Sequence, residues 1–151
     1  MKKYALLLLA IVVASCATKV NNGPEYNTRD GYIAQGYDVT EYFNNRAVEG
    51  YDAFATGYNG VKFRFANQEN LDKFKASPDK FVPQYGGYCA YAIAQGDKVD
   101  INPETFEIID DKLYLFYNSW GNNTLDTWNE EGAEVLREKA DMNWNTVRTK
   151  S

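Results

Sequence analysis

The sequence has no histidine and only two cysteines, Cys16 and Cys89, in 151 residues. Histidine is the usual partner of a catalytic serine or cysteine and a common nitrogen ligand of protein-bound metals. Its absence excludes Ser-His and Cys-His catalysis and histidine-based metal centres. Because Met142 is the only methionine besides Met1, soft-ligand or nucleophilic chemistry depends on the two cysteines.

Basic charge is also scarce. The chain carries 16 Lys and Arg against 21 Asp and Glu, a net charge of −5. Removing Lys2 and Lys3 with the leader described below leaves 14 basic against 21 acidic residues, a net charge of −7. Proteins that bind nucleic acid neutralise phosphates with Lys and Arg, and the sequence has no basic stripe. We therefore expect no nucleic acid partner.

No apolar run reaches the roughly 20 residues that a membrane-spanning helix needs. The apolar run at residues 5–14 instead follows two lysines and precedes a small residue, the pattern of an export signal. Val13-Ala14-Ser15-Cys16 resembles a bacterial lipobox, in which the cysteine is acylated and becomes the first residue. The alternative is an ordinary secretory signal cleaved near residues 14–17, in which Cys16 has no such role.

The lipobox predicts a lipoprotein of the bacterial cell envelope, anchored to a membrane through Cys16 and facing away from the cytoplasm. Several acyl chains on one residue give stable anchoring. We expect a signal peptide at 1–15, a flexible tether at 16–30, one folded domain at 31–144 and a C-terminal tail at 145–151. The tether is expected because residues 18–29 are polar and contain Asn21-Asn22-Gly23-Pro24.

The pattern of β-formers and turn residues predicts an α+β domain of hairpins and short helices. Asn59-Gly60 between the runs 54–58 and 61–66 is a strong hairpin signal, because both turn residues need a positive φ. A second hairpin is expected at 106–117. Residues 36–43 are rich in β-formers and predict an extended segment.

The helices follow from capping residues and apolar spacing. Asn67 is placed to cap a helix that Ser77-Pro78 ends, with a further turn at 79–82. After the break at Gly86-Gly87, residues 88–94 predict a helix. Helical spacing then continues over 124–144 and is divided by Gly132.

Several of these segments together resemble the YHS domain, and most closely its exported bacterial members. The resemblance covers roughly residues 31–144. It is carried by Gly36-Tyr37-Asp38 with Tyr42-Phe43, the hairpin and helix up to Phe81, Pro83 to Tyr91, Lys112 to Leu115, and Ala140-Asp141 with Asn143-Trp144.

The resemblance implies a YHS-like fold but no family-type metal site. Metal-binding relatives place cysteines at the step from strand to helix, where this chain has Ala66 and Asn70. We therefore predict no metal ligands. Exported members of the family include selenoproteins, and the resemblance would place selenocysteine at position 89. That implies redox use of Cys89.

Cys89 itself allows two interpretations. Gly86-Gly87 lets other groups approach the backbone, and Cys89 in the first turn of the next helix would gain thiolate character from the helix amides. In that case Tyr85, Gly86, Gly87, Tyr88, Cys89 and Tyr91 form a ligand-binding or redox site. Alternatively, Cys89 is a small buried side chain in an Ala-rich helix, since free cysteines are often buried.

The leading hypothesis is a non-catalytic, membrane-anchored lipoprotein that binds a small ligand, a metal ion or an envelope protein. The chain has few catalytic side chains, which argues against an enzyme. The alternative is a redox protein that depends on the Cys89 thiol. A third is a structural protein that interacts through its aromatic surface. No cofactor is expected; a soft metal ion on Cys89 is an open alternative, but the sequence provides no full ligand set.

Overall fold

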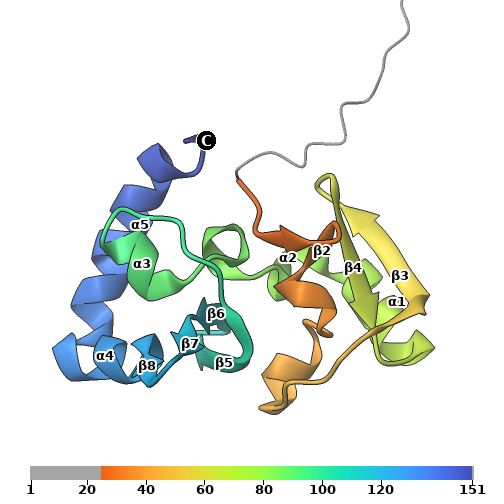
Figure 1. Cartoon of the computed structure of the whole chain (residues 1–151). Helices are drawn as coiled ribbons and strands as arrows, with labels where there is room; N and C mark the ends of the chain where they lie inside the picture. The colour runs from red at the N-terminus through yellow and green to blue at the C-terminus, as the bar shows by residue number, and fades with distance from the viewer. Residues whose placement is uncertain (1–24, 151) are drawn as a thin grey trace, which may run out of the picture.

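The N-terminal half of the molecule is a four-stranded sheet with two short helices beside it (Figure 1). The computed structural model describes residues 25–150, so the predicted signal peptide and Cys16 lie outside the described residues. The strands β1 (Thr28–Arg29), β2 (Tyr32–Ile33), β3 (Tyr51–Tyr58) and β4 (Val61–Phe65) are arranged in the order β1-β2-β4-β3. The Asn59-Gly60 hairpin is confirmed: β3 and β4 pair antiparallel, and the turn residues have φ of 51° and 79°.

The predicted helix after this hairpin is also confirmed. It is α1 (Gln68–Ala76), and the side chain of Asn67 accepts a hydrogen bond from Asn70 N at 2.8 Å. Pro78 then begins α2 (Pro78–Phe81). Leu71 and Phe74 are buried against the sheet, where Phe74 contacts the rings of Phe63 and Phe65.

The segment predicted as extended at 36–43 is only partly so. Tyr37 forms one antiparallel bridge with Glu49. Short 3-10 helices flank it at Ala34–Gly36 and Glu41–Asn44. The chain turns here because the Asp38 side chain accepts a hydrogen bond from Thr40 N at 2.9 Å, a local bond that competes with strand pairing.

The C-terminal half contains two further hairpins and three helices. β5 (Asn102–Ile109) and β6 (Lys112–Phe116) form the predicted second hairpin, and β7 (Asn118–Ser119) pairs with β8 (Asn122–Asn123). The helices are α3 (Ala90–Ala94), α4 (Thr124–Glu131) and α5 (Ala133–Val147), with Gly132 between the last two. The molecule is thus an α+β protein in which hairpins pack against helices.

Two of the predicted boundaries differ from the structure. Part of the segment assigned to the tether belongs to the folded domain: Asn27 N donates to Gly86 O at 2.8 Å, and β1 joins the sheet. At the other end α5 continues beyond residue 144 because Val147 is buried in the C-terminal core. Within residues 25–150, no helix combines the length and the apolar character needed to cross a membrane.

The molecule has two hydrophobic cores, and the first of them joins the two halves. The first lies mainly under the sheet but includes Cys89, Leu113 and Leu115 from the C-terminal half. The second lies between α3, α4, α5 and β6 and is centred on Trp128, which is fully buried. The strand β6 contributes alternate residues to both cores, with Leu113 and Leu115 in the first and Tyr114 and Phe116 in the second.

Candidate functional site

The segment with most of the predicted site residues, Gln84–Gly87 and the start of α3, lies between the two halves. The structure does not bring those residues into one site. Tyr85 and Gly86 line one cavity, Cys89 and Tyr91 line another, and Gly87 and Tyr88 line neither. The predicted ligand-binding set therefore divides into two separate places.

The backbone of this segment is unusual. Tyr85, Gly86 and Gly87 have φ of 56°, 61° and 81° in succession. A positive φ is costly for a bulky residue such as tyrosine, and such conformations cluster at binding sites. At position 86 an added Cβ would lie 1.8 Å from the carbonyl oxygen of Glu25. Glycine is therefore required where the N-terminal segment crosses.

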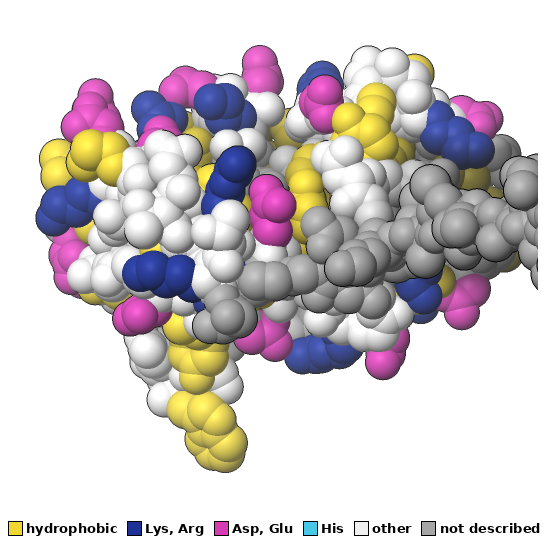
Figure 2. All heavy atoms as spheres, turned by 90° about the horizontal axis from the view of Figure 1, so that it is seen from above, with side chains coloured by type: hydrophobic (Ala, Val, Ile, Leu, Met, Phe, Trp, Pro, Cys, Tyr) yellow, Lys and Arg dark blue, Asp and Glu magenta, His cyan; other side chains and the backbone are white. Residues whose placement is uncertain are grey.

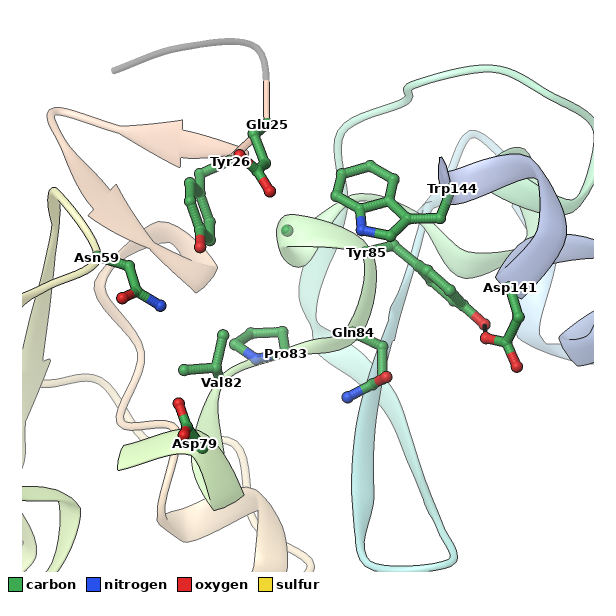
Figure 3. A pocket seen from close by; sticks show the side chains of 11 residues that line it. Glu25, Tyr26, Asn59, Asp79, Val82, Pro83, Gln84, Tyr85, Asp141 and Trp144 are labelled. Atoms are coloured by element: carbon green, nitrogen blue, oxygen red, sulfur yellow. Dashed lines mark hydrogen bonds between the residues drawn. The ribbon is translucent and has the colours of Figure 1, made fainter. Parts of the chain in front are cut away.

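The first cavity, which we call the inter-half cleft, has a volume of about 340 Å³ and opens between the two halves (Figure 3). Ligand pockets are preferentially found at such junctions. Aromatic side chains and carboxylates from both halves line it: Glu25, Tyr26, Asp79, Tyr85, Asp141 and Trp144. Tyr26 and Trp144 lie on opposite sides of the opening (Figure 3).

Two of the three carboxylates of the inter-half cleft accept hydrogen bonds from tyrosines. Tyr58 donates to Asp79, and Tyr85 donates to Asp141 Oδ1 at 2.7 Å. Burial, and then the adjacent Asp141 carboxylate, raise the pKa of Tyr85 far above its ordinary value. The phenol therefore stays protonated and fixes Asp141, whose side chain remains exposed at the edge of the cleft.

Cys89 is fully buried, and its contacts define the state of its thiol. The Thr124 hydroxyl donates its one hydrogen to Tyr117 O at 2.7 Å. The same hydroxyl oxygen lies 3.3 Å from Cys89 Sγ. The thiol is thus enclosed by the protein, with the Thr124 hydroxyl as its polar neighbour.

The position of Cys89 relative to the helix also differs from the prediction. Cys89 precedes α3 as its N-cap residue, and α3 has only 5 residues. The Cys89 backbone N–H donates to Val99 O at 3.0 Å. The expected setting in the first turn of a longer helix was wrong, because Tyr88 is still extended with φ of −78° and ψ of 162°.

The second cavity, which we call the Cys89 pocket, has a volume of about 330 Å³. Its lining is mixed and combines apolar and aromatic residues with polar and charged ones: Cys89, Tyr91, Ala92, Gln95, Asp97, Val99, Tyr117, Asn122 and Thr124. Tyr91 is anchored by a hydrogen bond from its hydroxyl to Glu131 Oε1 at 3.1 Å.

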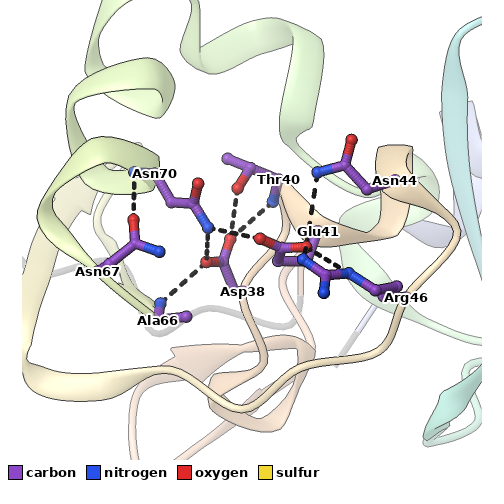
Figure 4. Close-up of polar contacts among 8 residues, drawn as sticks. All are labelled: Asp38, Thr40, Glu41, Asn44, Arg46, Ala66, Asn67 and Asn70. Atoms are coloured by element: carbon purple, nitrogen blue, oxygen red, sulfur yellow. Dashed lines mark hydrogen bonds and ion pairs between the residues drawn. The ribbon is translucent and has the colours of Figure 1, made fainter.

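A buried polar network that the sequence pattern does not predict lies beside α1 (Figure 4). Asp38 accepts four hydrogen bonds, from Thr40 N, Thr40 Oγ1, Ala66 N and Asn70 Nδ2, at 2.7–2.9 Å. The Asn70 amide also donates to Glu41 Oε1 at 2.9 Å, and Arg46 pairs with the other oxygen of Glu41 at 2.5 Å. Ala66 and Asn70, the positions at which the resemblance to the YHS domain would place cysteines, are therefore joined to buried carboxylates.

Asp38 in Gly36-Tyr37-Asp38 was a signal for this network, since a carboxylate among β-formers needs partners when it is buried. Its partner Asn70 is 32 residues away, which the sequence pattern does not show. Among residues 25–150, no three Cys, Asp or Glu side chains are grouped so as to hold a metal ion.

Comparison with known proteins identifies no relative: no family model matches the chain, and no curated protein or solved structure is significantly similar to it. The resemblance to the YHS domain therefore stays a prediction from the residues that carry it.

Proposed function

We propose that this protein is a non-catalytic binding module with a YHS-like domain, held at a bacterial envelope membrane by a lipid on Cys16. Its ligand is a small cation that binds in the inter-half cleft. The observation that carries this proposal is the composition of the cleft, where carboxylates and aromatic rings from both halves surround one cavity.

The chemistry of the cleft favours a positive charge. Glu25, Asp79 and Asp141 contribute three carboxylates, and the half-buried indole of Trp144 lines the same cavity. A cation near an aromatic face gains about 0.5–2 kcal/mol, most when the site is partly desolvated. The lining described for the cleft includes no Lys or Arg, although Arg148 lies 3.9 Å from Glu25 Oε1.

The alternative redox function through Cys89 is less well supported. Reactive cysteines are at least partly exposed, and here Cys89 is fully buried. Alkylation of the folded protein tests this directly. We expect Cys89 to be protected until denaturation, and rapid labelling of the folded chain at neutral pH would favour the redox function instead.

Isothermal titration with choline, spermidine and L-arginine tests the cation proposal, with citrate as an anionic comparison. We expect at least one cation to bind and citrate not to bind, with an affinity that falls as salt is added. Binding of citrate alone, or of no probe, would refute the proposal.

Two variants locate the binding. Trp144→Leu should weaken it roughly 2-fold to 30-fold through loss of the aromatic face. Asp141→Asn keeps an acceptor for the Tyr85 hydroxyl and should weaken binding about 2-fold to 5-fold. Asp111→Asn, at an exposed hairpin tip with φ of 58°, removes the same charge elsewhere and should have no effect.

A further inference from the structure

The carboxylates of the inter-half cleft are spread over its walls rather than grouped. Within the described part of the chain, no three Cys, Asp or Glu side chains are close enough together to share one metal ion. Asp79 belongs to α2 of the N-terminal half, and Asp141 belongs to α5 of the C-terminal half. Figure 3 shows them on opposite sides of the cleft. The cleft therefore presents negative charge at two separate places.

The first place lies around Tyr26. Burial and the carboxylate of Glu25 raise the pKa of Tyr26, and Asp79 adds to the effect, so both carboxylates act on the same wall of the cleft. Arg148 lies 3.9 Å from Glu25 Oε1 and partly neutralises it. The ion pairs found within residues 25–150 do not include Asp79. This wall can therefore receive one positive group.

The second place lies beside Tyr85 on the other wall. The Tyr85 hydroxyl donates to Asp141 Oδ1 at 2.7 Å, and a hydrogen bond from a neutral phenol does not neutralise the carboxylate. Asp141 also forms no ion pair with another residue of the described range 25–150. Trp144 follows Asp141 by three residues on α5, which places the two on neighbouring turns of the same face. A carboxylate and an indole are thus available together to a second positive group.

Between these two places the lining of the cleft is neutral. It consists of Val82, Pro83 and Gln84, and Figure 3 shows Val82 and Pro83 between Asp79 and Asp141. A compact cation can contact only one of the two places. A chain of methylene groups that carries a positive charge at each end can contact both places and cover the apolar residues between them.

We propose that the ligand of the inter-half cleft is a linear polyamine, in which methylene chains join an ammonium group at one end to an ammonium group at the other. One ammonium group lies beside Glu25 and Asp79, and the other lies beside Asp141 and Trp144. This inference rests on the proposed function, because it specifies the class of cation that the cleft binds.

The general charge of the surface does not account for such a preference. In Figure 2 acidic side chains are interspersed with basic and neutral ones, and they do not merge into one broad negative patch on this face. Exposed charges are also screened beyond about 8–10 Å at physiological ionic strength. A preference for two ammonium groups over one therefore depends on the carboxylates of the cleft.

Isothermal titration of the full chain with putrescine and with butylamine tests the inference, because the two probes share one carbon chain and differ by one ammonium group. We expect putrescine to bind roughly 3-fold to 30-fold more tightly, since its second ammonium group gains a carboxylate and an aromatic neighbour. Equal affinities would overturn the polyamine inference and leave the proposed cation binding in place. If neither probe bound, and choline, spermidine and L-arginine did not bind either, both proposals would be refuted.

Two variants test whether both places are used. Asp79→Asn keeps an acceptor for Tyr58, Asp141→Asn keeps one for Tyr85, and both side chains are exposed, so the fold should be retained. Each variant should reduce the preference for putrescine over butylamine about 2-fold to 5-fold. Asp111→Asn removes the same charge elsewhere and should leave the preference unchanged. A loss in only one of the two cleft variants, or an equal loss in Asp111→Asn, would overturn the inference.

Discussion

The buried network beside α1 and the inter-half cleft are both built from carboxylates, but they differ in what their oxygens contact. In the network, Asp38 and Glu41 accept hydrogen bonds from donors of the protein itself, and both carboxylates are buried. In the cleft, Asp79 and Asp141 receive hydrogen bonds from tyrosines but remain exposed. The difference indicates that the first set stabilises the fold and the second is available to a ligand.

This comparison predicts the largest loss of stability in the network. Asp38→Asn replaces one acceptor oxygen with an N–H₂ group that faces the donors of Thr40, Ala66 and Asn70. Some of these buried donors are then left without an acceptor. We expect the free energy of unfolding to fall by about 3–5 kcal/mol, measured by denaturant titration. Asp111→Asn is the control and should change stability by less than about 0.5 kcal/mol. An equally small change for Asp38→Asn would show that the network does not support the fold.

A smaller loss is expected where the cleft depends on backbone contact. Gly86→Ala introduces a Cβ that would lie 1.8 Å from Glu25 O at a φ of 61°. The N-terminal segment must then move away, with a cost of about 2–4 kcal/mol. Thermal unfolding measures this loss. Gly96→Ala is the control: it has a similar positive φ of 88° but nothing within 4 Å of the added Cβ. Equal losses in the two variants would mean that the contact with Glu25 is unimportant.

The network should also make stability depend on pH. Burial alone would raise the pKa of Glu41, but hydrogen bonds from Asn70, Arg46 and Asn44 outweigh it and leave the pKa lowered. A carboxyl group whose pKa is lower in the folded state than in the unfolded state stabilises the folded protein at any pH above its unfolded pKa, which for glutamate is about 4.3. This contribution is lost as the pH falls through the folded pKa. Denaturant titrations between about pH 6 and pH 3 should therefore show a decrease. In Glu41→Gln the decrease should be smaller, and an unchanged pH profile would contradict this assignment.

The smallest effect on stability is expected in the cleft itself. Asp141→Asn keeps the acceptor for Tyr85 and removes only an exposed charge, so its free energy of unfolding should change by less than about 0.5 kcal/mol. Its affinity for a cationic probe should nevertheless fall. A variant that lost stability and kept its affinity would reverse the roles that we assign to the two regions.

Local features of the fold were predictable from the sequence, and long-range ones were not. The Asn59-Gly60 hairpin and the Asn67 cap follow from backbone preferences of single residues, and both are confirmed.

The start of α3 was misplaced because Ala-rich composition continues into Tyr88, which stays extended. The site was predicted around Cys89, but its residues divide between two cavities because Tyr85 and Gly86 take positive φ values. Glu25, Asp79 and Asp141 are brought together only by tertiary structure.

The most direct test of the cleft uses the three tryptophans that the chain contains. Trp144 lines the cleft, Trp128 is fully buried, and Trp120 is exposed on the β7–β8 hairpin. Their indole N–H signals should be resolved in a ¹⁵N–¹H correlation spectrum of the chain from residue 17. On titration with spermidine, choline or L-arginine, we predict that the Trp144 signal shifts in a saturable way while the other two stay in place. A saturable shift of Trp120 alone, or no shift of any indole, would contradict binding of a cation in the inter-half cleft.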